Sequence, residues 1–297
     1  MDGLVIAVVG GDEREQEIAR LAAAAGATVR AFGFPWPSEG IAGVVLAASA
    51  WEALADADYA LFPIPGLSSA GALFAPAAAE AIVPDTALLA AMRPGATIIL
   101  GTADAALHRC AAELGHRLVE YEGDTELMLL RGPAIVEGAL RTAIENTVIT
   151  IHGASVAVVG HGNIGRLLAR TLVLLGARVH VFARNAVQRA DASAAGCSAH
   201  PLADLRAQAG GLDIVFSTVP VLVVDREVLR ALPERVLVLD LAAPPGGVDH
   251  EAAVGLARRV IWARGLGRRA PVTVGASQWR GIAQRISGIE KERSDES

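Results

Sequence analysis

Residues 155–165, SVAVVGHGNIG, join an apolar strand to a glycine-rich turn and to the start of a helix. A second apolar run follows at 177–182, and this strand–helix–strand context is typical of a dinucleotide-binding unit. In such a unit Gly160 permits the tight turn, Gly162 lets the backbone approach a pyrophosphate, and Gly165 lets the helix pack closely on the sheet. A structural turn without a ligand is the alternative. The turn residues predicted to bind the cofactor are Gly160, His161, Gly162, Asn163, Ile164 and Gly165.

The end of the second strand predicts which nicotinamide cofactor is bound. NAD sites usually carry Asp or Glu there, to bind the ribose 2′-hydroxyl. Here the strand ends in Ala183-Arg184-Asn185, and Arg189 follows one turn later. A guanidinium can pair with a 2′-phosphate, so we expect NADP(H) rather than NAD(H), bound by Arg184, Asn185 and Arg189. The alternative for Arg184 is a solvated surface charge.

Two further strand ends should lie at the same edge of the sheet. The run 213–216 leads into Ser217-Thr218-Val219-Pro220, which we expect beside the nicotinamide or its ribose. Asp240 ends the next strand and precedes a loop rich in proline and glycine. Gly246 and Gly247 of that loop are predicted to form a substrate wall, with an ordinary structural turn as the alternative.

The chain also repeats itself. An apolar run at 4–9, a glycine turn at 10–12, a helical pattern and a second apolar run at 27–32 match the order seen from residue 155 onward. Apolar runs alternating with helical patterns indicate parallel sheets. We therefore predict an α/β protein of two Rossmann-like doubly wound domains with a cleft between them. The first spans 1–136 and binds substrate. The second spans 137–276, binds NADP, and includes a bridging helix at 133–147 that has Pro133 in its first turn.

The first repeat differs from the second in its glycine turn. Asp12, Glu13 and Glu15 place three carboxylates where a pyrophosphate would lie, so we expect no second dinucleotide there. The loops of this domain are instead predicted to hold the substrate, through Asp12, Arg14, Ser68, Ser69 and Glu137. Helix capping by the acids and an ordinary Ser/Gly loop are the alternatives. A final helix from 277 is expected to pack back on this domain, and residues 290–297 are expected to fray.

Composition narrows the class of protein further. Of the 297 residues 53% are apolar and the net charge is −6, which disfavours nucleic acid as a partner. No apolar run is long enough for a membrane span and no signal peptide is visible, so we expect a cytoplasmic protein. Cys110 and Cys197 show no redox or metal-ligand spacing, and no metal is expected. A homo-oligomer, most simply a dimer, is a general expectation for such enzymes.

Several segments together resemble the dipicolinate synthase A family. They are AVVGGD at 7–12, VEG at 136–138, IHGASVAVVG at 151–160, LDLA at 239–242, PGGVD at 245–249 and APVTVG at 270–275. The resemblance covers almost the whole chain. It implies NADP-dependent oxidation of dihydrodipicolinate, a role in sporulation and a second subunit that is small and flavoprotein-like. Ala243-Pro244 departs from the family's Ser-Arg. If that arginine binds a substrate carboxylate in the family, then either the substrate of this chain differs, or Arg264, Arg268 or Arg269 replaces the arginine.

The predicted reaction is hydride transfer between the nicotinamide and a small dicarboxylate, and it needs a proton carrier. His250, Glu137 and Asp240 are the candidates. Another NADP-dependent imine or 2-oxo-acid reductase, or a non-catalytic NADP-binding subunit of a larger complex, would share the same motifs.

Overall fold

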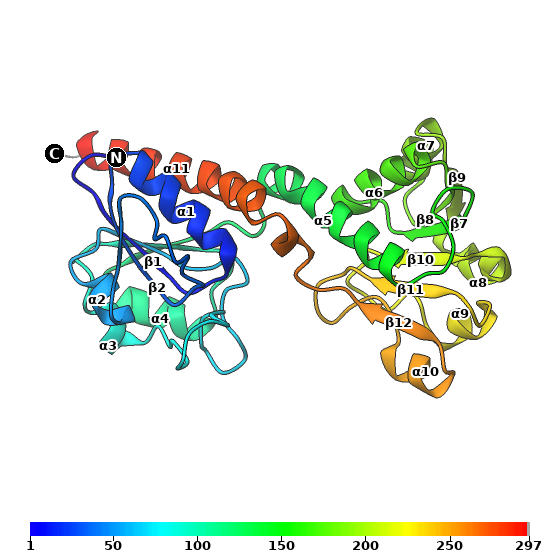
Figure 1. The fold of residues 1–297 in the computed structure, drawn as a ribbon, viewed down its shortest axis with the longest axis horizontal. Coiled ribbons are helices and arrows are strands. Elements are labelled where there is room, and N and C mark those ends of the chain that lie inside the picture. The colour runs from blue at the N-terminus through cyan, green and yellow to red at the C-terminus, as the bar shows by residue number, and fades with distance from the viewer. Residues whose placement is uncertain (296–297) are drawn as a thin grey trace. The chain divides into compact units, whose positions relative to one another are not determined.

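The chain forms two compact units in the computed structural model, which describes residues 1–295. The first unit comprises 1–131 together with the C-terminal segment from residue 270, and the second comprises 132–269. Each unit contains one six-stranded parallel sheet with helices on both faces (Figure 1), which confirms the predicted pair of Rossmann-like α/β folds. The boundaries after 131 and 269 differ by a few residues from the predicted ones after 136 and 276.

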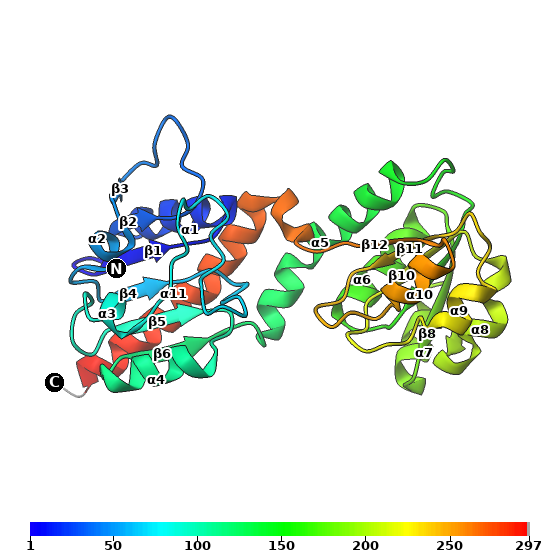
Figure 2. The same ribbon diagram turned by 90° about the horizontal axis from the view of Figure 1, so that it is seen from below.

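The sheet of the first unit has the strand order β3-β2-β1-β4-β5-β6. Its strands, visible side by side in Figure 2, are β1 (Val5–Val9), β2 (Thr28–Phe32), β3 (Val44–Leu46), β4 (Tyr59–Leu61), β5 (Thr97–Leu100) and β6 (Arg117–Glu120). One face is covered by α1 (Glu13–Ala24) and α11 (Pro271–Asp295), and the other by α2 (Ala50–Leu54), α3 (Thr86–Leu89) and α4 (Ala105–Glu113). A separate apolar core fills the space on each face.

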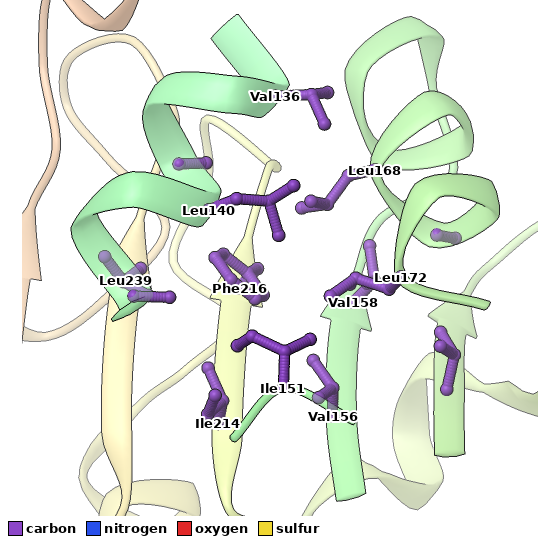
Figure 3. Close-up of a cluster of buried hydrophobic side chains, with 14 of the residues drawn as sticks. Val136, Leu140, Ile151, Val156, Val158, Leu168, Leu172, Ile214, Phe216 and Leu239 are labelled. Carbon is purple, nitrogen blue, oxygen red and sulfur yellow. The ribbon is translucent and has the colours of Figure 1, made fainter. Parts of the chain in front are cut away.

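The second unit repeats this topology, with the order β12-β11-β10-β7-β8-β9. Its strands are β7 (Ser155–Val159), β8 (Arg178–Ala183), β9 (Ser198–Pro201), β10 (Ile214–Ser217), β11 (Leu237–Asp240) and β12 (Arg259–Trp262). Its helices include α6 (Asn163–Leu174), α7 (Ala186–Ala194), α8 (Leu205–Gln208), α9 (Arg226–Ala231) and α10 (His250–Gly255). Figure 3 shows how Val136 and Leu140 meet Leu168 and Leu172 of α6 above the apolar strand residues of this sheet.

The helix α5 is longer than predicted and runs over Thr125–Glu145, so Pro133 lies inside it instead of in its first turn. The helix begins where the Asp124 carboxylate accepts hydrogen bonds from the N–H groups of Glu126 and Leu127. This cap supplies a start signal nine residues before the proline. Pro133 itself has no N–H to donate to the preceding turn, which removes one hydrogen bond of the helix.

Helix α11 packs along α1 of the first unit, as both ribbon views show (Figures 1 and 2). Gly275 makes this possible, since a Cβ there would lie 2.5 Å from the Arg14 carbonyl oxygen. Helical structure continues to Asp295, so residues 290–295 do not fray, and residues 296–297 lie outside the described part. Glu290 accepts a hydrogen bond from the Tyr59 hydroxyl at 2.6 Å, which fixes the end of the helix on the sheet. Within residues 1–295, no helix is both long and apolar enough to cross a membrane.

Candidate functional site

The glycine turn of the second unit has the geometry that its spacing predicts. Gly160 adopts φ +94°, and a Cβ there would lie 2.6 Å from the Thr218 hydroxyl oxygen. A Cβ on Gly165 would lie 2.3 Å from the Gly160 carbonyl oxygen, so only glycine lets α6 start so close to the turn. A Cβ on Gly162 would meet nothing within 4 Å. The first and third glycines are therefore needed for packing, whereas the second borders open space.

The start of α6 presents backbone N–H groups without a side-chain cap. Gly162 is the N-cap residue and supplies no side-chain hydrogen bond. Asn163 is exposed, whereas Ile164 is half-buried and packs on the apolar core. The uncapped first turn carries the positive end of the helix dipole, which favours an anion.

His161 lies within the turn but its side chain points into the protein. The imidazole is buried, and its Nε2 lies 2.9 Å from the Asp191 carboxylate on α7. This hydrogen bond holds the pKa of the Asp191 carboxyl below its usual range, and the nearby Arg170 acts in the same direction. His161 thus links the glycine turn to α7.

The polar residues after β8 form a compact loop. Asn185 is the N-cap of α7, because its side chain accepts a hydrogen bond from the Val187 N–H at 2.7 Å. The Arg189 guanidinium donates to the carbonyl oxygens of Ala183 and Arg184, at 2.9 and 2.6 Å. Arg184 itself is exposed at the end of the strand. Arg184 and Arg189 therefore place two guanidinium groups at one strand end, while the Asn185 side chain is occupied by capping.

The segment that follows β10 supports the turn more than it lines open space. The Thr218 hydroxyl donates to the Val159 carbonyl oxygen at 3.0 Å, beneath Gly160. Ser217 is completely buried, and a Cβ on Gly247 would lie 2.4 Å from its hydroxyl oxygen. This burial corrects the prediction that Ser217 meets the nicotinamide. Val219 is half-buried beside Gly160, and Pro220 is exposed.

Asp240 anchors the loop that follows β11. Its carboxylate is fully buried and accepts hydrogen bonds from the backbone N–H groups of Ala242, Gly247 and Val248, at 3.0, 2.8 and 3.2 Å. A carboxylate engaged in this way cannot reach a substrate, which corrects its predicted role as a proton carrier. Gly246 is buried as well, and a Cβ there would lie 2.7 Å from the Asp240 carboxylate. Gly246 and Gly247 are thus packing positions and not an exposed wall.

His250 remains accessible at the same edge of the sheet. Its side chain is 34% exposed, and its Nε2 lies 3.4 Å from the Asp240 carboxylate. The imidazole stacks on Trp262 with ring centroids 5.1 Å apart, and the Arg264 guanidinium lies 5.4 Å from the Trp262 ring. Trp262 was not among the predicted site residues, although a tryptophan at a strand end is conspicuous in a chain with only 4% aromatic residues.

Glu137, the third predicted proton carrier, is exposed on α5 and forms an ion pair with Arg269. The structure does not bring it into contact with the His250 cluster of Asp240, Trp262 and Arg264. In residues 1–295, His, Cys, Asp and Glu side chains form no group of three that is suited to a metal ion.

The corresponding turn of the first unit is closed by its own side chains. Asp12 is the N-cap of α1 and forms a capping box with Glu15. Its buried carboxylate also accepts two hydrogen bonds from the Arg14 guanidinium, at 2.7 and 2.9 Å. The Gly11 N–H donates to the Phe74 carbonyl oxygen at 2.6 Å. Asp12, which we predicted to bind substrate, therefore caps the helix, and the Gly11 N–H is engaged by a carbonyl oxygen of the same unit.

Burial raises the pKa of Glu15 to about 7, and the Asp12 charge adds to this effect. Ser68 and Ser69 are exposed in the loop after β4. The Ser68 hydroxyl accepts a hydrogen bond from the Ala72 N–H at 3.3 Å, which closes a small turn. Asp12 and Arg14 are buried, so among the predicted substrate ligands that lie in the first unit these two serines are the exposed ones.

Comparisons with known proteins match a different family model to each of the two units. The family model for the N-terminal domain of dipicolinate synthase A matches residues 5–122, and that for shikimate/quinate 5-dehydrogenase matches residues 142–255. The dipicolinate synthase A protein of Bacillus subtilis (strain 168) is 30% identical over 98% of this chain and 99% of that protein.

Solved structures give the same picture. The crystal structure of dipicolinate synthase A from Bacillus halodurans has a TM-score of 0.86 and 29% identity, over 95% of this chain and 98% of the other. A transhydrogenase from Sinorhizobium meliloti shares the fold at 14% identity, with a TM-score of 0.71, over 96% and 94% of the two chains.

Proposed function

Since the chain belongs to the dipicolinate synthase A family, we propose that it is an NADP-dependent oxidoreductase acting on a small dicarboxylate of the dihydrodipicolinate type. The observation that carries the proposal is the uncapped start of α6 behind Gly162, with Arg184 at the neighbouring strand end. An open position at Gly162 and free helix N–H groups suit a pyrophosphate, and a guanidinium suits a 2′-phosphate.

The residues of the second unit divide the work of holding the cofactor. The first-turn N–H groups of α6 bind the pyrophosphate, and Arg184 and Arg189 bind the 2′-phosphate. Thr218 and Val219 support the turn from below, which keeps Gly160 in its left-handed conformation. When bound, the nicotinamide supplies the hydride acceptor or donor.

The proton is carried by His250 in this proposal. One ring nitrogen faces the Asp240 carboxylate, which orients the imidazole, and the exposed part of the ring is left to exchange a proton with substrate. Trp262 restricts the ring further by stacking. Arg264, held over Trp262, lies next to this histidine and is our candidate for the guanidinium that binds a substrate carboxylate. Arg269 is less suitable because it pairs with Glu137.

Calorimetric titration with NADPH, NADP⁺ and NADH tests the cofactor assignment. We expect NADPH to bind more tightly than NADH, and Arg184→Ala to weaken NADPH by about 1.5–3 kcal/mol with little effect on NADH, because a hydrogen bond to a charged group is lost. Arg206→Ala, which removes an exposed arginine elsewhere in the same unit, is the matched control. Equal affinity for both nucleotides, unchanged by Arg184→Ala, would remove the NADP assignment.

The Bacillus subtilis relative is named as one subunit of a synthase. We therefore propose that this chain also works with a second, flavoprotein-like subunit. Turnover of dihydrodipicolinate by the isolated chain, compared with turnover in the presence of such a companion, tests this point. Full activity of the isolated chain would show that the companion is not needed for the chemistry.

A further inference from the structure

A pocket of about 690 Å³ lies in the first unit. It is lined by Phe32 at the end of β2, by residues 48–51 after β3, and by residues 79–83, 85, 87 and 88. Phe32 ends β2 and residues 48–51 follow β3, so these two segments lie at the carboxyl ends of strands, where doubly wound folds bind their ligands. Its size is in the range of small-molecule sites. Neither the family comparisons nor the proposed oxidoreductase chemistry assigns a role to it.

The internal repeat shows which part of a nucleotide site this pocket corresponds to. Phe32 pairs with Val9 in the first sheet as Phe182 pairs with Val159 in the second. The end of this second strand is the side of a dinucleotide fold that meets the adenosine ribose. The pocket of the first unit therefore corresponds to the space next to Arg184 in the second unit.

The phosphate half of such a site is missing from the first unit. The Gly11 N–H is bound to the Phe74 carbonyl oxygen, and Asp12 with Glu15 caps the helix start. The buried Ile82 lies against Gly33, where a Cβ would approach it to 2.6 Å, and so closes the side of the pocket that faces the turn. The glycine turn of the first unit is thus engaged by its own chain and does not offer the phosphate site that the second unit has.

The lining is suited to an aromatic ring without negative charge. Phe32 and Trp51 supply aromatic surface, and Ile82, Val83 and Leu88 supply aliphatic surface. Trp51 is 59% exposed and so has a large part of its ring available for contact. The polar side chains of the lining are Ser49, Glu80 and Asp85, and the lining contains no Lys, Arg or His. Two carboxylates without a cation repel a phosphate or a dicarboxylate and accept hydrogen bonds from amino or hydroxyl groups.

We propose that this pocket is a second ligand site, which binds a planar heteroaromatic ring of the nucleoside class that carries no phosphate. The ring lies between Phe32 and Trp51, and its amino or ribose hydroxyl groups donate hydrogen bonds to Glu80, since Ser49 and Asp85 already cap α2 and α3. All of its lining residues belong to the first unit.

Fluorine NMR of the full chain labelled with 5-fluorotryptophan tests the proposal, using adenosine and AMP as probes. The chain has four tryptophans, at 36, 51, 262 and 279, and Trp51→Phe assigns the resonance of interest. We expect adenosine to shift the Trp51 resonance saturably, and AMP to bind about ten-fold more weakly because its phosphate faces two carboxylates. Trp262 reports separately on the second unit.

Variants separate the pocket from other effects. Ala81→Phe, at an exposed lining position, should abolish the shift, and Trp51→Ala should weaken adenosine binding by about 2- to 12-fold, measured by calorimetry. Val45→Ala, which removes an equally exposed side chain outside the lining, should leave binding unchanged. No Trp51 shift up to about 10 mM adenosine, far above the affinity of a formed site, would overturn the proposal. Equal binding of adenosine and AMP, or a shift that survives Ala81→Phe, would overturn it as well.

Discussion

Replacing Gly162 by Asp should stabilise the second unit and at the same time abolish its nucleotide binding. In the internal repeat, Gly162 corresponds to Asp12, since each is the N-cap of the helix after the glycine turn. Nothing lies within 4 Å of a Cβ at Gly162, so the first atom of the side chain fits without displacing any other atom. The substitution therefore places a capping carboxylate at the glycine turn of the second unit, as Asp12 does in the first unit.

The two effects have different sizes. An Asp cap gains a few tenths of a kcal/mol over Gly and interacts favourably with the helix dipole, for a total of about 0.5–1 kcal/mol. For a unit of this size that corresponds to an increase in Tm of about 1–4 °C. A carboxylate roughly 5 Å from one phosphate charge, at an effective dielectric constant of about 20, costs about 3 kcal/mol of binding free energy. Nucleotide affinity should thus fall by roughly 160-fold, at 1.36 kcal/mol for each factor of ten.

Calorimetric titration with NADPH and differential scanning calorimetry measure the two effects on the same sample. Gly211→Asp is the control, because it makes the same change in the second unit at another open position. NADPH affinity within about three-fold of wild type, in a variant that is at least as stable, would show that the pyrophosphate does not lie at this turn. A lower Tm would show that Gly162 is needed for folding, contrary to the open geometry.

Three further predictions concern single residues. Gly165→Ala should destabilise the second unit by about 1–3 kcal/mol in urea unfolding, because its Cβ would collide with the Gly160 carbonyl oxygen; an unchanged midpoint would contradict this. Burial raises the pKa of Glu15 from 4.5 to about 7, so the folded state holds the proton more tightly than the unfolded state. As the pH rises from 4.5 to 7, the wild type should therefore lose about 3 kcal/mol of folding stability relative to Glu15→Gln. Parallel curves of stability against pH for the two proteins would refute this prediction. His250→Gln should lower kcat at least about 100-fold while NADPH affinity stays unchanged, and an unaltered pH–rate profile would exclude this histidine as the proton carrier.

The sequence was most informative where function depends on neighbours in the chain. The roles of Gly160, Gly162 and Gly165 follow from a turn of six residues, and their geometry agrees with the spacing. The presence of two sheets with the same topology follows in the same way from the repeated apolar runs. The start of α5 was missed because Pro133 is a strong local signal, while the Asp124 cap that actually starts the helix stands alone in a loop.

Long-range packing accounts for the rest. Ser217 and Asp240 end adjacent strands, as predicted, but the loop at 243–247 folds back over both of them. No rule of spacing reveals that this loop needs a buried carboxylate to hold it. The stacking of His250 on Trp262 likewise joins residues from two different elements, so neither residue alone signals the pair.

The return of α11 to the first unit has a consequence for biosynthesis. The apolar face of α1, with Ile18 and Ala22, is covered by Ile282 and Ile286, which leave the ribosome only after the whole of 132–269. At about 5–20 residues per second, the nascent first unit waits roughly 7–28 s for its last helix, while the later-encoded unit already has every strand it needs. The second unit is therefore the first that can finish folding during translation, and the incomplete first unit is the stage at which a chaperone would have apolar surface to bind.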